Sequence, residues 1–405
     1  MNIAIRKIFE EGEGVFRMVP AFVSKNFNSP GKRLKLHPDD YYYYGMKAGA
    51  IMERWFCSIN KARNHNPERE DEGLSYVLGF DGEQILFADA VSELKEELIG
   101  NSLQDTYGTW PVFAKFFDYG NPLFFHFHPG AVVAERVGCS AKPECYYFPP
   151  QLNSHAGARP STYFGFNPDV TKEEIRSRIE HFGDYDTHIT SLSKAYDLEL
   201  GTGWYIPAGV LHAPGLLLTY EPQWGTDLNC VFENVVCGEV YSTDYLSDIC
   251  PPEEENKVDY IMNAVDWDKN FDPDFKAHYF RPPCPLPYKD KNLTEKWICY
   301  GNDYLAAKEV SIAPKSTVTL VDEAAYGCVV IQGFGLFGAY NAEAVNMMRA
   351  GDLTADEFFV SKNSANKGIK IVNNSVSEPM VILQHFGPDN AVYATTMTPA
   401  LDKTV

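Results

Sequence analysis

Three histidines and one glutamate are candidate ligands for a metal ion. They are His126 and His128 in "FFHFHPG", Glu144 in "KPECYYF" and His212 in "GWYIPAGVLHAPG". Imidazole nitrogens and a carboxylate bind zinc, iron, nickel or manganese, and ligand type alone does not choose among these metals. We therefore expect one divalent metal, with zinc first and iron, nickel or manganese as alternatives.

Strand geometry explains how these residues could meet. His126 and His128 lie two apart in a predicted strand, so their side chains face the same side. The same alternation puts Lys142, Glu144 and Tyr146 on one face of the next strand. A lone His-x-His pair is a weak signal, Glu144 could pair with Lys142 at the surface, and His212 could be a core histidine. Three strands of one barrel can bring the four side chains to one point. The combination is stronger than each part, because the turn before His212 matches a known pattern.

The motifs resemble those of the cupin superfamily, and more narrowly of the type I mannose-6-phosphate isomerases. Gly201, Pro207, Gly209 and His212 match the second cupin motif, and "HFH" followed by glutamate matches the first. The order of motifs from about residue 45 to 235 is similar to that of the isomerases. The resemblance implies a cupin fold, a metal held by His126, His128, Glu144 and His212, and a sugar or sugar-phosphate substrate.

The chain departs from the family pattern at two positions. His126 stands where the family has glutamine, which gives three histidines and one glutamate and leaves the expectation of a metal intact. Val231 stands where bacterial members carry an arginine implicated in catalysis and in contacting the phosphosugar. We expect Arg136 or Arg159 to take its place in substrate binding, together with Tyr146. For Arg136, an ion pair or solvated edge with Glu135 is the plainer alternative.

Aldose–ketose isomerisation moves a proton between adjacent carbons through an enediol. It needs a base near the carbon and stabilisation of the developing oxyanion, to which a divalent metal contributes. Lys142, beside Glu144, is the first catalytic candidate, with a surface lysine as the alternative. Glu221 and Asp227 are further base candidates in "EPQWGTD". The segment "LKLHPDDYYYYG" (34–45) repeats His-Pro, but it lacks a second histidine and is interpreted as rim or packing.

Short aromatic and β-branched runs, separated by turn residues, predict an all-β-dominated protein. We expect two cupin-type (jelly-roll) β-barrels: a metal-binding domain over 1–247 and a second, metal-free barrel over 297–405. The proline-rich segment 248–296 is predicted to connect them. Helical patterns are few. "AVSELKEELIG" (90–100) ends at Gly100, and a helical insertion near 169–183 begins with Thr171 as cap and Glu174 as capping-box partner.

Composition limits the partners. The net charge of −20 argues against nucleic acid and anionic membranes, and no run of 18 apolar residues predicts a membrane span. Nine irregularly spaced cysteines and no apparent signal peptide favour reduced thiols in a cytoplasmic protein. We expect a small-molecule sugar ligand and leave a homodimer open.

Three functions are consistent with these residues. A metal-dependent sugar or sugar-phosphate isomerase is the leading hypothesis. The replacement of the family arginine by Val231 keeps open a carbohydrate-binding cupin with a structural metal. The three-histidine set keeps open an iron-dependent cupin oxygenase.

Overall fold

The computed structural model describes residues 3–64, 69–153, 159–287 and 290–390. Strands make up 32% of the described residues and helices 21%. The β-dominated class is therefore confirmed, whereas the expectation of few helices is wrong. Every strand pairing in the sheets is antiparallel.

Two sheets carry the predicted metal ligands. The seven-stranded sheet has, in order, β17 (Phe280–Arg281), β11 (Gly203–Ile206), β8 (Glu144–Tyr147), β13 (Thr219–Trp224), β6 (Val112–Phe117), β3 (Ala50–Phe56) and β2 (Ala21–Lys25). The five-stranded sheet has β10 (Ser193–Asp197), β9 (Ser161–Phe166), β12 (His212–Ala213), β7 (His126–Phe127) and β14 (Cys230–Val231).

Two further sheets form the other half of the molecule. The nine-stranded sheet has β18 (Cys284–Pro285), β19 (Leu293–Cys299), β20 (Ala306–Ile312), β27 (Met380–Phe386), β22 (Tyr326–Gln332), β25 (Glu357–Val360), β1 (Val15–Val19), β4 (Tyr76–Leu78) and β5 (Gln84–Leu86). The four-stranded sheet has β21 (Thr317–Leu320), β26 (Ile369–Asn373), β23 (Phe334–Phe337) and β24 (Tyr340–Glu343). A separate ribbon pairs β15 (Val235–Val236) with β16 (Glu239–Val240).

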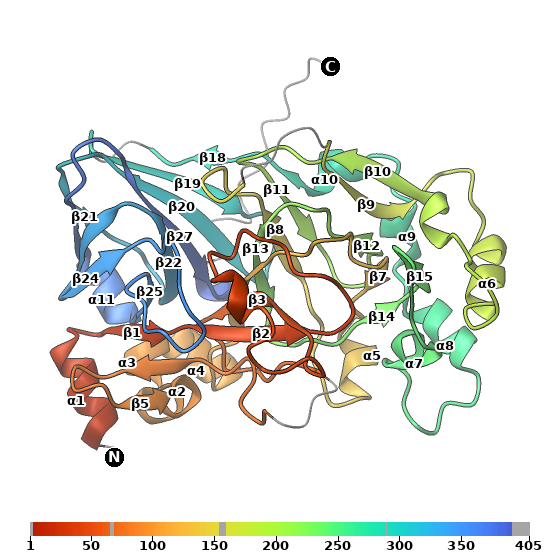
Figure 1. Ribbon diagram of the computed structural model, residues 1–405, viewed down its shortest axis with the longest axis horizontal. Coiled ribbons are helices and arrows are strands. Elements are labelled where there is room, and N and C mark those ends of the chain that lie inside the picture. Colours follow the sequence, from red (N-terminus) through yellow and green to blue (C-terminus); the bar gives the residue numbers. More distant parts are fainter. Residues whose placement is uncertain (1–2, 65–68, 154–158, 288–289, 391–405) are drawn as a thin grey trace.

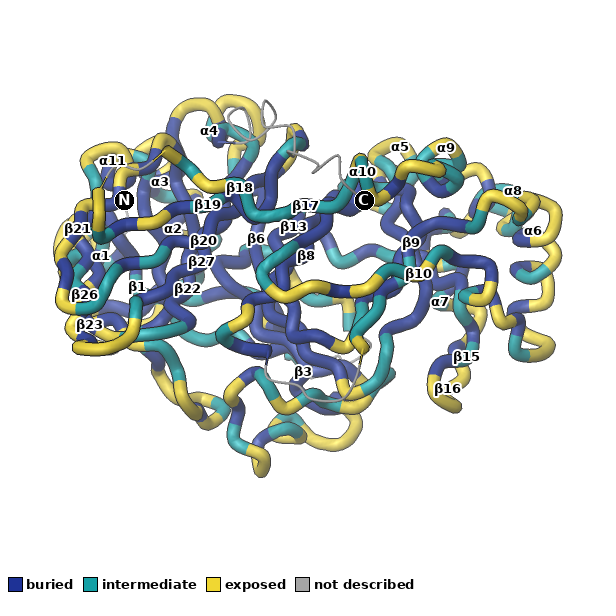
Figure 2. The backbone as a smooth tube through the Cα atoms, turned by 90° about the horizontal axis from the view of Figure 1, so that it is seen from above, coloured by how far each residue is buried: buried dark blue, intermediate teal, exposed yellow. Residues whose placement is uncertain are grey.

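The four large sheets stack as layers, with three apolar cores between them. One core joins the five- and seven-stranded sheets, a second joins the seven- and nine-stranded sheets, and a third joins the nine- and four-stranded sheets. Central strands such as β3, β6 and β27 are buried along their whole length, whereas β21 alternates exposed and buried residues as an outer strand must. Figure 2 shows this contrast between the buried centre and the exposed periphery.

The expected pair of closed jelly-roll barrels is not confirmed. Each sheet in the described residues ends in two edge strands, so the halves are sandwiches of open sheets. The domain boundaries at 247 and 297 stay a prediction. The sheet order adds one fact: β1, β4 and β5 come from the first 86 residues but pair within the nine-stranded sheet, with β1 beside β25 (Figure 1).

Eleven α-helices occur in the described residues. They are α1 (Ile3–Glu11), α2 (Phe87–Leu94), α3 (Glu96–Ile99), α4 (Asn101–Tyr107), α5 (Ala131–Glu135), α6 (Lys172–Glu180), α7 (Thr243–Ser247), α8 (Lys257–Ala264), α9 (Trp267–Asn270), α10 (Phe275–Tyr279) and α11 (Lys362–Lys367).

The two predicted helices are present with corrections. The first is broken into α2 and α3 because Lys95 has a φ of 46°, and Gly100 ends α3 as expected. In α6 the Thr171 side chain accepts a hydrogen bond from the Glu174 backbone N–H, as predicted. The helix ends at Glu180, three residues before Gly183, and the Glu174 carboxylate accepts a bond from Arg178.

The segment predicted as a connector forms helices that cover the five-stranded sheet. The Phe275 ring stacks on Phe164 of β9, with ring centroids 5.2 Å apart. Trp267 stacks on Phe166 of the same strand. These aromatic contacts hold α9 and α10 against β9, so this segment is part of the core around the predicted site.

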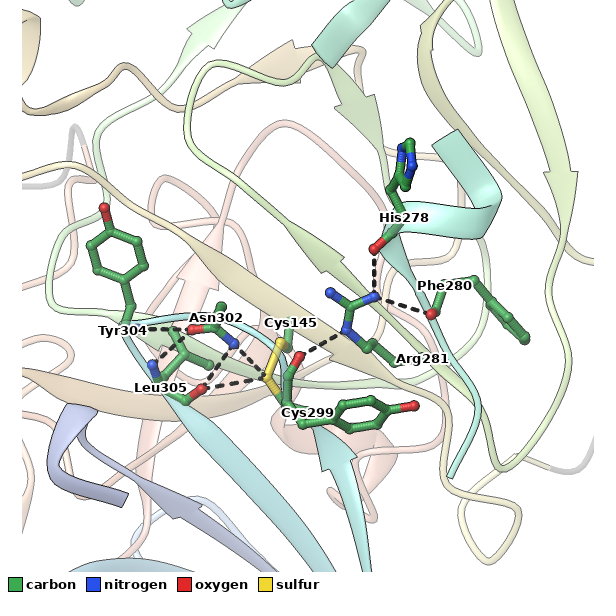
Figure 3. Close-up of a disulfide and its surroundings, with 9 residues drawn as sticks. Cys145, His278, Phe280, Arg281, Cys299, Asn302, Tyr304 and Leu305 are labelled. Carbon is green, nitrogen blue, oxygen red and sulfur yellow. Dashed lines mark hydrogen bonds between the residues drawn. A yellow bond between two sulfur atoms is a disulfide. The ribbon is translucent and has the colours of Figure 1, made fainter. Parts of the chain in front are cut away.

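A disulfide joins Cys145 of β8 to Cys299 of β19, and therefore links the seven- and nine-stranded sheets (Figure 3). The expectation that all nine cysteines are reduced is wrong, because two cysteines distant in sequence meet where the two sheets pack. Seven cysteines are free thiols. Among the described residues, no helix combines the length and apolar character needed to cross a lipid bilayer.

Candidate metal centre and active site

Three buried histidines converge between the five- and seven-stranded sheets. His126 lies in β7, His128 follows that strand, and His212 in β12 is directly opposite His126 in the strand register. Each offers one nitrogen, and these three atoms lie within 4.8 Å of one another. The alternation expected from the sequence thus brings His126 and His128 to the same side.

Backbone carbonyls fix the orientation of all three rings. The Nδ1–H groups donate to the carbonyl oxygens of Phe124, Leu228 and Val210, at 2.9, 2.7 and 2.9 Å from His126, His128 and His212 respectively. These bonds place the ring proton on Nδ1 and leave each Nε2 as a lone-pair donor. This is the arrangement found in histidines that bind metals.

Burial keeps the imidazoles of His126 and His128 neutral. It lowers the pKa of His126 well below its usual value, and the neighbouring rings of His212 and His128 lower it further. Burial and the nearby Lys142 ammonium lower the pKa of His128 to about 4. Neutral imidazole is the form that coordinates a metal.

Glu144 completes the cluster from the opposite sheet. Its carboxylate oxygens lie 3.1 Å from His212 Nε2 and 3.3 Å from His128 Nε2. Burial opposes its ionisation, but Lys142 and His128 outweigh that effect and hold the pKa of Glu144 well below its usual value. His212 Nε2 and Glu144 Oε1 have no hydrogen-bond partner among the described residues, although they are buried, whereas Glu144 Oε2 is ion-paired with Lys142.

These buried and unsatisfied atoms test whether the site fits a metal. Leaving His212 Nε2 and Glu144 Oε1 unpaired is costly, whereas a cation between them would satisfy both at once. Three imidazole nitrogens and one carboxylate are a donor set for a divalent transition metal. The residues therefore fit such an ion, and this donor set does not select zinc over iron, nickel or manganese.

Lys142 and Glu221 lie next to the cluster. Lys142 Nζ is 2.8 Å from Glu144 Oε2, 3.2 Å from His128 Nε2 and 3.2 Å from Glu221 Oε1. Burial, with Glu144 adding to it, raises the pKa of Glu221 to about 8. Glu221 is therefore a carboxyl group that can hold a proton at neutral pH.

Two further charged residues were missed in the sequence. Lys115 is paired with Glu221 in the register of β6 and β13, with Nζ 3.4 Å from Glu221 Oε1. Glu53 of β3 lies 3.8 Å from Lys115 and accepts a 2.8 Å bond from the indole of Trp55. Lys115 is the one charge in the apolar strand "VFAKFF", and Glu53 lies beside Arg54 in the otherwise apolar strand "AIMERWF"; charged residues in such strands were the available signal.

A cavity of about 360 Å³ leads to the histidines. His126, His128 and Lys142 lie among its walls, as do Lys115 and Glu53. Its size suits a small polar molecule. The predicted metal cluster and the cavity are thus one site.

Asp227, a predicted base, also lines this cavity. It pairs with Lys25 at 3.4 Å and accepts a 3.1 Å bond from the backbone N–H of Arg63. Burial opposes its ionisation, but Lys25 and Lys115 lower the pKa of Asp227 to about 2. It is therefore a carboxylate at neutral pH.

Three predicted substrate-binding residues lie outside the cavity walls. Arg136 ends α5 at the surface, with Nη2 3.5 Å from Glu253. Arg159 is 83% exposed and pairs with Asp197. Tyr146 is buried in β8, with its ring 6.1 Å from that of His212. The geometry gives none of them a place on the wall of the described cavity.

Neither Val231 nor the segment 34–45 supplies a charged group to the wall of the described cavity. Val231, which the motif resemblance aligns with the family's arginine, is buried in β14 opposite His126. Among the described residues, the arginine that lines the cavity is Arg63. In the rim segment, Asp40 pairs with Arg349 at 2.7 Å, which ties that segment to the other half of the molecule.

The fold of this chain is similar to that of several solved structures. Searches found no matching family model and no matching curated protein. The mannose 6-phosphate isomerase of Bacillus subtilis is similar in structure, with a TM-score of 0.62 and 18% identity over 92% of this chain and 99% of that one. A variant of phosphomannose isomerase from Salmonella typhimurium has a TM-score of 0.61 and 10% identity over 93% and 100%. The resemblance seen in the motifs is confirmed at the level of the fold.

Proposed function

We propose that the protein is a metal-dependent aldose–ketose isomerase acting on a sugar or sugar phosphate. One observation supports this most directly: three histidine Nε2 atoms converge beside Glu144 at a cavity that also holds Lys142 and is flanked by Glu221. The fold shared with solved isomerases supports the same reaction class. A homodimer and a cytoplasmic location remain predictions.

In this proposal His126, His128, Glu144 and His212 hold one divalent ion, with zinc as the first expectation. Such an ion, when bound, polarises the carbonyl and hydroxyl oxygens of the substrate. The chain itself contributes rigidity. The Nδ1 bonds of the histidines and the close packing of the two sheets fix the ligands before substrate binds.

Proton transfer falls to the pair formed by Lys142 and Glu221. A carboxyl with a pKa of about 8 takes or gives a proton readily near neutral pH, which suits a group that must remove a proton from one carbon and return it to the next. The Lys142 ammonium, 3.2 Å from Glu221, stabilises the ionised state and donates to a substrate oxygen. Asp227, ionised and paired with Lys25, accepts hydrogen bonds from substrate hydroxyls.

A sugar-binding protein with a structural metal is the second candidate. The observation in its favour is Val231, which is buried where the related isomerases carry an arginine. This candidate predicts sugar binding that survives His128→Ala and His212→Ala, with no turnover. An iron-dependent oxygenase, the third candidate, predicts oxygen consumption by the iron-loaded protein.

Elemental analysis combined with turnover assays tests the proposal. Purified protein, loaded in turn with zinc, manganese, nickel and iron, is assayed for interconversion of aldoses and ketoses, both free and phosphorylated. Isomerisation that stops with a chelator and returns with the metal is the expected result. Protein that carries one metal per chain and converts none of the sugars is not an isomerase.

A further inference from the structure

We propose that the cavity takes an unphosphorylated sugar. This inference rests on the proposed isomerase function and concerns its substrate class. A phosphate monoester carries a charge of about −2 near neutral pH and is bound by cations that are available to it. The cations around this cavity are already paired with carboxylates and are therefore not available in this way.

Each of the four cations that line the cavity already has a carboxylate partner. The pairs are Lys25–Asp227 at 3.4 Å, Arg63–Asp248 at 2.8 Å, Lys115–Glu53 at 3.8 Å and Lys142–Glu144 at 2.8 Å. Among the described residues, the cavity therefore offers a phosphate no cation without an acidic partner.

Acidic groups also outnumber the cations. Four carboxylates line the cavity and Glu144 contacts Lys142, which makes five carboxylates against four cations; Glu221, which can hold a proton at neutral pH, lies beside the same lysine. A divalent ion at the histidines brings this cluster close to neutrality, and an uncharged sugar preserves that balance. A phosphate dianion would add negative charge beside carboxylates in a partly buried site, where like charges repel strongly.

A phosphate would have to compete with a carboxylate for each of these cations. Lys25 and Asp227 have side chains only 6% and 11% exposed, so a displaced Asp227 would remain as a buried and unpaired charge. Arg63 and Asp248 are each 39% exposed, and this pair is therefore the easiest to separate. The strength of the Arg63–Asp248 pair therefore determines how strongly phosphate is excluded from the cavity.

The remaining wall suits hydroxyl groups and the carbon faces of a sugar ring. Amide side chains supply neutral donors and acceptors, and aromatic rings supply apolar surface; these residues are Asn26, Asn64, Asn229, Phe27, Phe124 and Tyr245. Ionised Asp227 and Asp248 accept hydrogen bonds from hydroxyls, which carry no charge to repel them. The cavity therefore recognises a neutral polyol through hydrogen bonds and stacking.

The test compares free and phosphorylated sugars on the same metal-loaded, full-length protein. Free aldohexoses and ketohexoses are assayed beside their 6-phosphates, and we expect kcat/KM to be at least ten-fold higher for a free sugar. A higher kcat/KM for a phosphorylated sugar overturns the inference and leaves the isomerase function standing. If neither is converted, the isomerase function fails, and calorimetric titration with a hexitol and its phosphate still decides the ligand class. Tighter binding of the hexitol supports the inference, and tighter binding of its phosphate, or no binding of either, overturns it.

One variant tests the role of the Arg63–Asp248 pair directly. Asp248→Asn removes the carboxylate partner of Arg63, so we expect inorganic phosphate to bind at least ten-fold more tightly than to the wild type. The matched control, Asp184→Asn, removes a surface carboxylate that pairs with His181 away from the cavity, and its phosphate affinity should equal that of the wild type. Unchanged phosphate affinity in Asp248→Asn contradicts the proposed exclusion by pairing.

Discussion

Glu144 and Cys145 are consecutive residues of β8 whose side chains leave the strand on opposite faces. The Glu144 carboxylate lies 3.1 Å from His212 Nε2, on the side of the five-stranded sheet. Cys145 is bonded to Cys299 of β19, on the side of the nine-stranded sheet (Figure 3). Strand β8 thus carries a predicted metal ligand on one face and, on the opposite face, a covalent link to the other half of the molecule.

We expect loss of this disulfide to destabilise the fold. The bond closes a loop of 154 residues, and removing a native disulfide costs roughly 2–5 kcal/mol. Cys299→Ser should therefore lower the free energy of unfolding, measured by denaturant titration without reductant, by about that amount. Cys237→Ser, which replaces an exposed free thiol, is the control.

A thiol count checks the premise independently. Alkylation of the unfolded protein without reductant should modify seven cysteines, and all nine after reduction. Nine modified cysteines without reductant would show that the bond is absent from the purified protein. That result would restore the expectation of reduced thiols.

Metal binding should depend on His212 and should stabilise the fold. Loss of an outer-shell partner alone weakens metal binding roughly 10- to 100-fold, so loss of the ligand in His212→Ala should weaken it at least as much. Wild-type protein should gain about 2.7 kcal/mol in unfolding free energy when free metal is 100 times its Kd. Calorimetry and thermal unfolding with and without chelator measure both effects, and the exposed His181→Ala is the control. Equal metal content in His212→Ala and wild type would exclude His212 as a ligand.

Local patterns predicted the strands and much of the site. Alternation of side chains along a strand depends only on the backbone, so the shared face of His126 and His128, and of Lys142 and Glu144, could be predicted from spacing. The Thr171 cap is equally local, and it is confirmed. The short helices α9 and α10 were missed because packing of Trp267 and Phe275 on β9, rather than their own periodicity, stabilises them.

Pairings between layers could not be predicted in the same way. The bond between Cys145 and Cys299 and the approach of Lys115 to Glu53 depend on which strands become neighbours in space. Arg136 and Arg159 were chosen because the family position holds Val231, yet sequence does not show the direction in which a loop or short helix carries a side chain. Arg63, which does line the cavity, carried no motif to mark it.

His385 should make the fold less stable in acid. Burial lowers the pKa of His385 to about 3 in the folded protein, whereas the unfolded chain takes up the proton near pH 6.5. Stability from this group is therefore complete above about pH 6.5 and falls as the pH drops toward 3, by about 2 kcal/mol at pH 5. His385→Gln should remove that part of the loss between pH 7 and 5, measured as the change in unfolding free energy.

The control variant, Tyr220→Phe, leaves the His385 imidazole in place. Tyr220 Oη lies 3.0 Å from His385 Nδ1, so Tyr220→Phe deletes this contact but leaves the histidine buried. This variant should retain the loss of stability between pH 7 and 5. An identical pH dependence in His385→Gln and wild type would show that His385 does not contribute to it.

Lys142 and Arg159 separate a residue at the cavity from one outside it. Lys142→Gln should lower kcat by roughly 10²–10⁴-fold, the contribution typical of a positioned proton-transfer group. Metal content should remain near the wild-type value, because Lys142 contacts Glu144 and His128 without being one of the proposed ligands. Arg159→Gln should change kcat/KM less than about two-fold, because the Arg159 side chain is 83% exposed and such a surface ion pair with Asp197 contributes little to structure or binding. If Arg159→Gln instead raises KM at least ten-fold at unchanged kcat, the substrate extends beyond the cavity to that surface, and the arginine has the binding role predicted from the sequence.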